Sequence, residues 1–300
     1  MKKFAIITAA VVMLLTVLSS CGEKSIAITG FPVQLGEGGD SYGNINVVCD
    51  LDALTEKLGN AKAYLYGPAE ETDYRVASRL GFNEKNHRDT NGGMGRSYIE
   101  FSEEINATAK LEIDKYGSFL YESGYVKTET DFPYSVEEVL DMGRDILKGY
   151  GVWDGNFRLT SYNEERIYDK MPGEPKITGR DAKFFRVAPD GRDIYNEAAT
   201  VKINADGKTV EILFDARHYK NRNEAQLIPV AEAFAKADIG RALVGLPEEP
   251  SELVFDSIDI VYWSAQNADG EYILQPLYRF GGTTADGIEY FTIVQANRVE

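Results

Sequence analysis

Asp-Gly pairs set between runs of alternating apolar and polar residues are the feature that most limits how this 300-residue chain can fold. They occur at 154–155, 190–191, 206–207, 269–270 and 286–287. Asp-Gly is a strong hairpin signal, because the tight turns that join antiparallel strands need positive φ angles. A two-residue loop at 206–207 places six apolar residues on one face, as the pairs Ile203 with Val210, Val201 with Ile212, and Ala199 with Phe214. A shift of one residue would destroy this match, so the sequence predicts an antiparallel hairpin here.

Short amphipathic helices alternate with the predicted hairpins. The clearest covers Ser135–Gly149, where Ser135 and Glu138 form an S-x-x-E capping box and apolar residues then recur at helical spacing. Shorter helices are predicted at 51–58, 72–80 and 229–236. The predicted fold class is therefore α+β, with antiparallel β-hairpin sheets and helices packed on one face.

The predicted hairpins resemble each other in sequence. Leu111–Gly117 is similar to Val201–Gly207, ninety positions later. We interpret the chain as two to three helix-then-hairpin units, with convergence of unrelated hairpins as the alternative.

The N-terminus carries the pattern of an export signal. Lys2 and Lys3 precede an apolar run, Phe4–Leu18, which is followed by small residues. This order is typical of a secretory signal peptide. An uncleaved membrane anchor is the alternative, but the run is shorter than the ~20 residues that a spanning helix needs.

The last four residues of this segment resemble the lipobox of bacterial lipoproteins. In that comparison Leu18, Ser19 and Ser20 are the recognition site of the signal peptidase, and Cys21 is the lipidated residue that becomes the mature N-terminus. The resemblance implies a lipid-anchored protein on the extracytoplasmic face of the cell membrane, or in the outer membrane or periplasm of a Gram-negative host. Its membrane partner is then the bilayer itself, reached through the N-terminal lipid.

Composition and periodicity divide the chain into five predicted segments. These are a lipoprotein signal peptide at 1–20, a glycine-rich flexible tether at 21–46, an N-terminal α+β unit at 47–132, a central unit at 133–220 and a C-terminal unit at 221–300. The pattern leaves open whether the three folded units form one domain or several.

The charge of the chain excludes one class of partner. The formal net charge is −16, and loss of Lys2 and Lys3 with the leader takes it to −18. Such a protein is repelled by phosphate backbones, so we expect no nucleic acid partner. A membrane sensor, a protease or another envelope protein is the expected kind of protein partner.

No catalytic signature is present in the sequence. The chain lacks the G-x-S-x-G, Walker, H-E-x-x-H and C-x-x-C patterns. His87 and His218 are far apart, and Cys49 lies in an apolar Val-Val-Cys run that predicts burial. We therefore predict a non-enzyme with no catalytic residues, no cofactor and no metal site.

Aromatic residues are the most suggestive groups, with 18 Tyr and 14 Phe. Most are expected in the core. An exposed remainder could recognise a protein or peptide, and the densest stretch predicts a candidate interaction surface of Tyr262, Trp263, Tyr278 and Phe280.

A family resemblance rests on the central and C-terminal units. The runs that carry it are Phe184–Val187, Gly191–Tyr195, Val201–Lys208, Leu274–Phe280 and Tyr290–Val294. They are similar to PepSY-type domains and to the extracytoplasmic accessory regulators of the Gram-positive cell-wall two-component system. The resemblance implies PepSY-like units that act by contact and lack an active site.

The function expected from these observations is a lipid-anchored, extracytoplasmic binding or regulatory protein that acts non-catalytically by protein contact. Two alternatives stay open at this level. One is a solute-binding lipoprotein of a transporter, and the other is a cell-wall hydrolase that uses a pair of acidic residues.

Overall fold

The computed structural model describes most of the chain beyond the predicted tether. The described residues are 46–68, 72–102, 107–124, 131–167, 176–237, 251–266 and 271–298. The predicted signal peptide, with Leu18, Ser19, Ser20 and Cys21, lies outside them, as does the tether up to residue 45. Among the helices of these ranges, none combines the length and the apolar character that crossing a bilayer requires.

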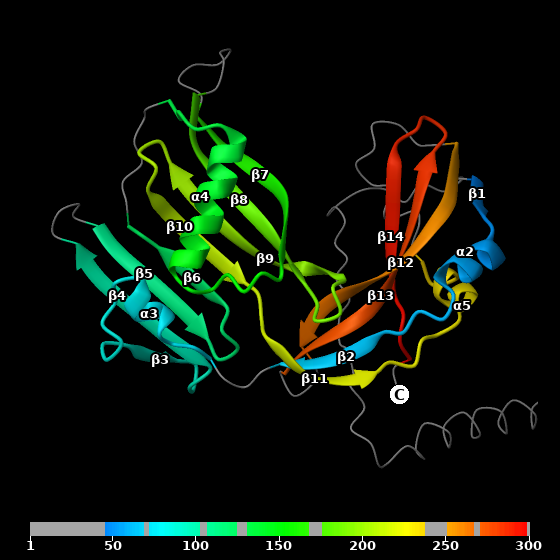
Figure 1. The fold of residues 1–300 in the computed structure, drawn as a ribbon, viewed down its shortest axis with the longest axis horizontal. Helices are drawn as coiled ribbons and strands as arrows, with labels where there is room; N and C mark the ends of the chain where they lie inside the picture. The colour runs from blue at the N-terminus through cyan, green and yellow to red at the C-terminus, as the bar shows by residue number, and fades with distance from the viewer. Residues whose placement is uncertain are drawn as a thin grey trace, which may run out of the picture.

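The strands join into one mixed β-sheet, which the structure gives as 14-stranded (Figure 1). Strand accounts for 52% of the structure and helix for 15%. The predicted α+β class, with antiparallel β-hairpin sheets and helices packed on one face, is therefore wrong. Turn and periodicity signals are local, and they do not state which hairpin edges pair with each other. Each hairpin leaves unpaired backbone groups along its edges, and here they pair with other hairpins.

Two pairings are parallel, which no hairpin can produce. β1 (Asn46–Cys49) runs parallel to β12 (Glu252–Gln266). β12 also meets β9 (Asp193–Asn204) in parallel, where Tyr262 lies opposite Ile194. This second contact joins the two halves of the sheet, which we call the first and second lobes.

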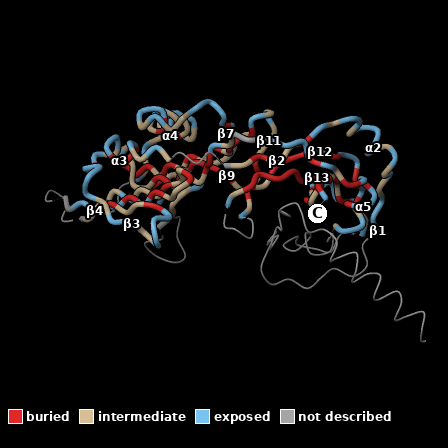
Figure 2. The backbone as a smooth tube through the Cα atoms, turned by 90° about the horizontal axis from the view of Figure 1, so that it is seen from below, coloured by how far each residue is buried: buried red, intermediate tan, exposed pale blue. Residues whose placement is uncertain are grey.

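The first lobe is an antiparallel sheet with helices on one face (Figures 1 and 2). In spatial order its strands are β3 (Arg88–Thr90), β4 (Gly95–Ser102), β5 (Ala107–Asp114), β6 (Phe119–Glu122), β10 (Thr209–Asp215), β9, β8 (Lys176–Val187) and β7 (Phe157–Ile167). The short helix α3 (Val76–Arg79) and the longer α4 (Val136–Gly149) accompany it.

Helix α4 confirms the prediction made from its capping box. The Ser135 backbone N–H donates to Glu138 Oε2 at 2.7 Å, and the Glu138 N–H donates to Ser135 Oγ at 3.2 Å. Val139 and Leu147 are fully buried against the sheet. A Cβ at Gly143 would come within 2.7 Å of the Ala182 Cβ, so glycine allows the helix to lie close to β8.

The second lobe contains both ends of the described chain. It consists of β1, β12, β13 (Tyr272–Thr284), β14 (Glu289–Gln295), β2 (Tyr64–Pro68), β11 (Tyr219–Glu224) and the helices α2 (Leu51–Leu58) and α5 (Val230–Phe234). Phe234 of α5 packs edge-on against Phe255 and Phe280, with ring centroids 5.2 and 5.1 Å away. Figure 2 shows buried backbone continuing from β9 into β2, β12 and β13, so the lobes share an interior.

The hairpin predicted at 206–207 is present, with a longer loop than predicted. Val201 pairs with Ile212 and Ala199 with Phe214, as predicted, but a bulge pairs Ile203 with Thr209 instead of Val210. Asn204 organises the loop, because its Oδ1 accepts from the backbone N–H groups of Asp206 and Lys208. A side-chain acceptor of this kind stabilises a turn without a two-residue loop.

The similar stretch at 111–117 makes the same turn. Asp114 Oδ1 accepts from the backbone N–H groups of Tyr116 and Ser118, as Asn204 does in its own loop. Gly117 and Gly207 follow with φ angles of 95° and 73°. The two hairpins also lie side by side in the first lobe, where β6 pairs with β10.

Candidate functional site

The predicted aromatic surface is not exposed as a unit. Tyr262, Tyr278 and Phe280 have 0%, 2% and 0% of their area accessible, so the prediction is wrong for these three residues. The physical reason is that these three residues lie on parts of β12 and β13 that other elements cover, and the burial of large aromatic side chains stabilises such a layer. The two tyrosine hydroxyls donate inside the protein, to Asp190 Oδ2 and to the Ile228 carbonyl. Trp263 is partly buried beside Val261, Leu277 and Ile293.

The residues weighed as reactive groups are dispersed. His87 lies 3.3 Å from Asp89 in β3, and His218 lies 3.8 Å from Asp154 near the start of β11. Cys49 is partly exposed rather than fully buried, and desolvation together with the neighbouring Asp50 raises the pKa of its thiol. Within the described ranges, no group of three or more His, Cys, Asp and Glu side chains is placed to hold a metal ion.

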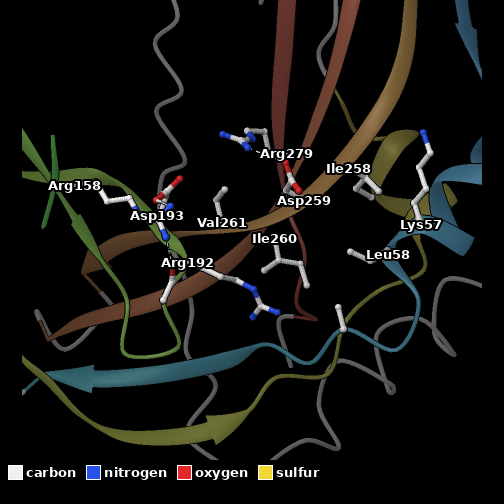
Figure 3. Close-up of a pocket in the computed structure, with 12 residues that line it drawn as sticks. Lys57, Leu58, Arg158, Arg192, Asp193, Ile258, Asp259, Ile260, Val261 and Arg279 are labelled. Carbon is white, nitrogen blue, oxygen red and sulfur yellow. Dashed lines mark hydrogen bonds and ion pairs between the residues drawn. The ribbon is translucent and has the colours of Figure 1, made fainter. Parts of the chain in front are cut away.

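A cleft of about 400 Å³ lies where the two lobes meet (Figure 3). Four cationic side chains line it: Lys57, Arg158, Arg192 and Arg279. Two carboxylates, Asp193 and Asp259, lie among them. Leu58, Ala61, Ile258, Ile260 and Val261 add apolar wall. The side chains of the lining therefore carry a net charge of +2, on a protein whose net charge is −16.

Both lobes contribute to this interlobe cleft. Arg158 comes from β7, Arg192 comes from the turn between β8 and β9, and Asp193 is the first residue of β9. The second lobe supplies Lys57 from the last turn of α2, with Asp259 of β12 directly opposite Arg279 of β13. Figure 3 shows the first-lobe groups and the second-lobe groups on opposite sides of the opening.

Two ion pairs line the cleft, one from each lobe. Arg158 Nη1 lies 3.0 Å from Asp193 Oδ1, and Arg279 Nη2 lies 2.8 Å from Asp259 Oδ2. The four side chains are 58%, 42%, 35% and 57% exposed, in that order. Pairs this accessible contribute only about 0–1 kcal/mol to folding, because water already solvates both partners well.

Arg192 is held more firmly and connects the lobes. Its Nη1 donates to Asp190 Oδ2 at 2.8 Å and to the Lys62 carbonyl at 2.7 Å. Asp190 Oδ2 also accepts from the Tyr262 hydroxyl, whose oxygen accepts from the Tyr64 backbone N–H at 3.1 Å. This chain of hydrogen bonds ties the β8–β9 turn to β12 and β2, so the position of Arg192 in the cleft is set by both lobes.

A buried polar network holds the lobes together. Glu197 of β9 is fully buried and accepts from the Arg217 Nη1 and backbone N–H groups, both at 3.1 Å. The Tyr219 hydroxyl hydrogen-bonds to Glu197, and it lies 2.8 Å from Ser264 Oγ of β12. The Arg217 guanidinium also stacks 3.5 Å from the centre of the Tyr272 ring of β13. The network joins buried residues of both lobes.

The pKa values in this network follow from burial. Desolvation raises the pKa of the Glu197 carboxyl above its ordinary value, although Arg217 and Tyr219 oppose this shift. Desolvation and the adjacent Glu197 carboxylate raise the pKa of Tyr219 well above its ordinary value. These perturbed groups have structural partners inside the junction and do not line the cleft.

A second hollow, of about 550 Å³, lies on the face of β5, β6 and β10. Its charged groups are Arg96, Arg217, Glu112, Asp114 and Asp215. Acids outnumber bases there, in keeping with the charge of the whole protein. The interlobe cleft is the more distinctive of the two, because its charge is opposite to that of the molecule.

Sequence reasoning did not find the interlobe cleft. Asp259 and Arg279 interrupt apolar strands at positions that share one face of the β12–β13 hairpin. Charged residues at these two positions could have indicated the second-lobe wall of the cleft. Nothing local indicates that Arg158 and Arg192 lie across from it.

Comparisons with known proteins give only distant neighbours. No family model and no curated protein matches this chain. An uncharacterized protein from Eubacterium rectale ATCC 33656 is similar in structure, with a TM-score of 0.41 and 11% identity over 80% of this chain and 84% of that one. The Bacillus megaterium YpeB C-terminal domain has a TM-score of 0.34 and 16% identity over 75% and 94%. At TM-scores below 0.5, neither neighbour establishes a shared fold.

Proposed function

We propose that this chain is a lipid-anchored, extracytoplasmic binding protein that acts without catalysis, by contact with another protein of the envelope. The interlobe cleft is the observation that carries the binding part of this proposal. The lipobox-like Leu18–Cys21 supports the location, with Cys21 as the acylated residue. Two or more acyl chains hold a protein stably at a bilayer, whereas one chain holds it only marginally.

Contact is favoured over chemistry by the way the polar groups are used. Catalytic groups with perturbed pKa values usually face a cleft, where a substrate can reach them. Here Glu197 and Tyr219 point into the junction, and their hydrogen bonds are made to Arg217 and Ser264. A membrane sensor or a protease of the envelope is the kind of partner that this mode of action suits.

A solute-binding lipoprotein is the second candidate, and the size of the cleft favours it. About 400 Å³ falls within the range of small-molecule sites, roughly 300–1,000 Å³. The two candidates differ in what occupies the cleft in the cell, and crosslinking from the cleft separates them.

The test is site-specific photo-crosslinking in the organism of origin. A photoreactive residue at Lys57, on the cleft, is compared with one at Arg144, on the exposed face of α4. We expect a protein adduct from the cleft position only. Equal adducts from both positions, or none from the cleft, would contradict protein contact through the cleft.

The membrane attachment has its own test. We expect an alkyne-tagged fatty acid to label the wild-type protein and not the Cys21→Ala variant. We also expect the crosslinked partner to be lost in that variant, because the protein is no longer held at the membrane. Labelling that persists in Cys21→Ala would refute the lipid anchor.

A further inference from the structure

We propose that the interlobe cleft binds a ligand that presents two carboxylates, one to the arginine on each side of the cleft. This inference rests on the proposed function and specifies the chemistry that its partner must carry. The first-lobe arginine is Arg158 and the second-lobe arginine is Arg279, and Arg192 and Lys57 also line the cleft.

The charge of the site selects a ligand with few negative charges. A net +2 in the lining is neutralised by two carboxylates. A long polyanion would also meet the strongly acidic remainder of the protein, and the summed field of those charges repels it. A short peptide segment with two acidic residues, or a small dicarboxylate, is attracted by the cationic cleft and is too short to be repelled by the acidic remainder of the protein.

The cleft already shows which group its arginines bind. Asp193 and Asp259 each place a carboxylate oxygen on an arginine nitrogen, at 3.0 and 2.8 Å. In the described part of the chain, Arg279 makes one side-chain hydrogen bond, from Nη2 to Asp259. The guanidinium group is a planar fork that fits a carboxylate through two parallel hydrogen bonds. A ligand carboxylate can therefore use the remaining donors of Arg279 or replace Asp259.

The rigidity of the cleft lowers the cost of binding. Arg192 is fixed by Asp190 and the Lys62 carbonyl, and the buried Glu197–Arg217 pair belongs to the network that joins the lobes. A site whose side chains are ordered before binding loses less conformational entropy when the ligand arrives. The strands that carry Arg158 and Arg279 are therefore held in place before the ligand arrives.

The first experiment is a calorimetric titration of the full chain in detergent micelles. The probe is a capped peptide with two glutamates separated by one glycine, and its control has glutamine in place of both glutamates. We expect the glutamate peptide to bind and the glutamine peptide not to bind. Arg158→Gln and Arg279→Gln should each weaken binding about tenfold or more, as expected for a hydrogen bond between charged groups.

Arg144→Gln is the matched control for Arg279→Gln. Arg144 is also 35% exposed, and it pairs with Asp141 at 3.0 Å on helix α4, outside the cleft. We expect its removal to leave binding unchanged. An equal loss in both variants would reveal a general charge effect and would overturn the assignment.

Removal of the aspartate that competes with the ligand should raise the affinity for the glutamate peptide, whereas removal of an arginine lowers it. Asp259→Asn frees Arg279 and is expected to tighten binding of the glutamate peptide several-fold, whereas Asp141→Asn changes nothing. A merely structural role of the Asp259–Arg279 pair would weaken binding in both cleft variants. Weaker binding in Asp259→Asn therefore contradicts the proposal.

Free dicarboxylate and inorganic phosphate complete the test. If glutarate binds through Arg158 and Arg279 and the peptide does not, the carboxylate assignment stands and protein contact fails. If phosphate binds more tightly than either carboxylate probe, or if no carboxylate probe binds, the inference is overturned. In that case the crosslinking experiment still decides the proposed function independently.

Discussion

Two arginine–carboxylate pairs of this protein have nearly the same geometry and very different surroundings. In the lobe junction, Arg217 Nη1 lies 3.1 Å from Glu197 Oε1, and the side chains are 6% and 0% exposed. On the cleft wall, Arg279 Nη2 lies 2.8 Å from Asp259 Oδ2, and the side chains are 35% and 57% exposed. We expect the shorter pair to have the weaker interaction energy. The reason is that exposure to solvent changes the energy of an ion pair more than a few tenths of an ångström in distance does.

The comparison distinguishes an ion pair that stabilises the fold from one whose carboxylate a ligand can replace. Removing one partner of a buried pair leaves a charge without water or counter-charge. Removing one partner of an exposed pair leaves a charge that water solvates. The junction pair therefore holds the lobes together, while the cleft pair can give way to a ligand at little cost. Substitutions at these pairs probe the difference, from the largest expected effect to the smallest.

Glu197→Ala should lower the free energy of unfolding by about 2–3 kcal/mol, because Arg217 loses its buried partner and keeps only Asp215, 2.9 Å from its Nη2. Urea denaturation measures this loss. Glu197→Gln keeps one of the two acceptor oxygens and should lose less, which gives a measurable variant if the alanine form does not fold. A loss below about 1 kcal/mol in both variants would break the comparison, since the junction pair would then behave like an exposed one.

The Asp154–Arg186 pair is intermediate, with side chains 30% and 6% exposed and a distance of 2.8 Å. Desolvation raises the pKa of Asp154, but the hydrogen bond and charge of Arg186 outweigh it, so the pKa is lowered overall. A lowered carboxyl pKa stabilises the fold above the ordinary value of 3.8, and this contribution is lost as the pH falls through the folded-state pKa.

Asp154→Asn should therefore cost about 1.5 kcal/mol at pH 6, a value typical of a hydrogen bond between charged groups. The difference from wild type should shrink as the pH falls below 4. Urea denaturation at a series of pH values measures both effects. A difference that grows at low pH would contradict the expected sign.

Asp259→Asn and Arg279→Gln should change the free energy of unfolding by less than about 1 kcal/mol. Any loss should decrease further in high salt, because screening weakens exposed pairs. The same denaturation assay checks this, with Asp141→Asn as the matched surface variant. A loss as large as that of Glu197→Ala would mean that the cleft pair is structural, and the comparison would fail.

Much of the local structure could be predicted from the sequence. The capping box of α4, the helix at 51–58 and two of the three pairs predicted at the 206–207 hairpin are present. The loop itself was predicted two residues long. The side chain of Asn204 supports a longer loop, and this requires a bulge at the next strand. Such details depend on hydrogen bonds that turn propensities do not resolve.

The candidate site could not be predicted in the same way. Tyr262, Tyr278 and Phe280 were expected to recognise a partner because they are dense in sequence, yet they fill the interior. Arg158 and Arg279, by contrast, belong to strands that never pair with each other and meet only across the interlobe cleft. A polar side chain on one strand becomes part of a binding site only when the fold places a second strand, distant in sequence, across from it.

The amino-acid sequence alone determined the turns, the α4 helix and its cap, and the apolar faces of the strands, because each of these depends on neighbours a few residues away. The tertiary structure decided how the hairpins join into one mixed sheet, which aromatic residues are buried and where the four cationic side chains converge. Those outcomes depend on pairings between segments far apart in the chain, which are selected by the burial of apolar sheet faces and by the pairing of hairpin edges.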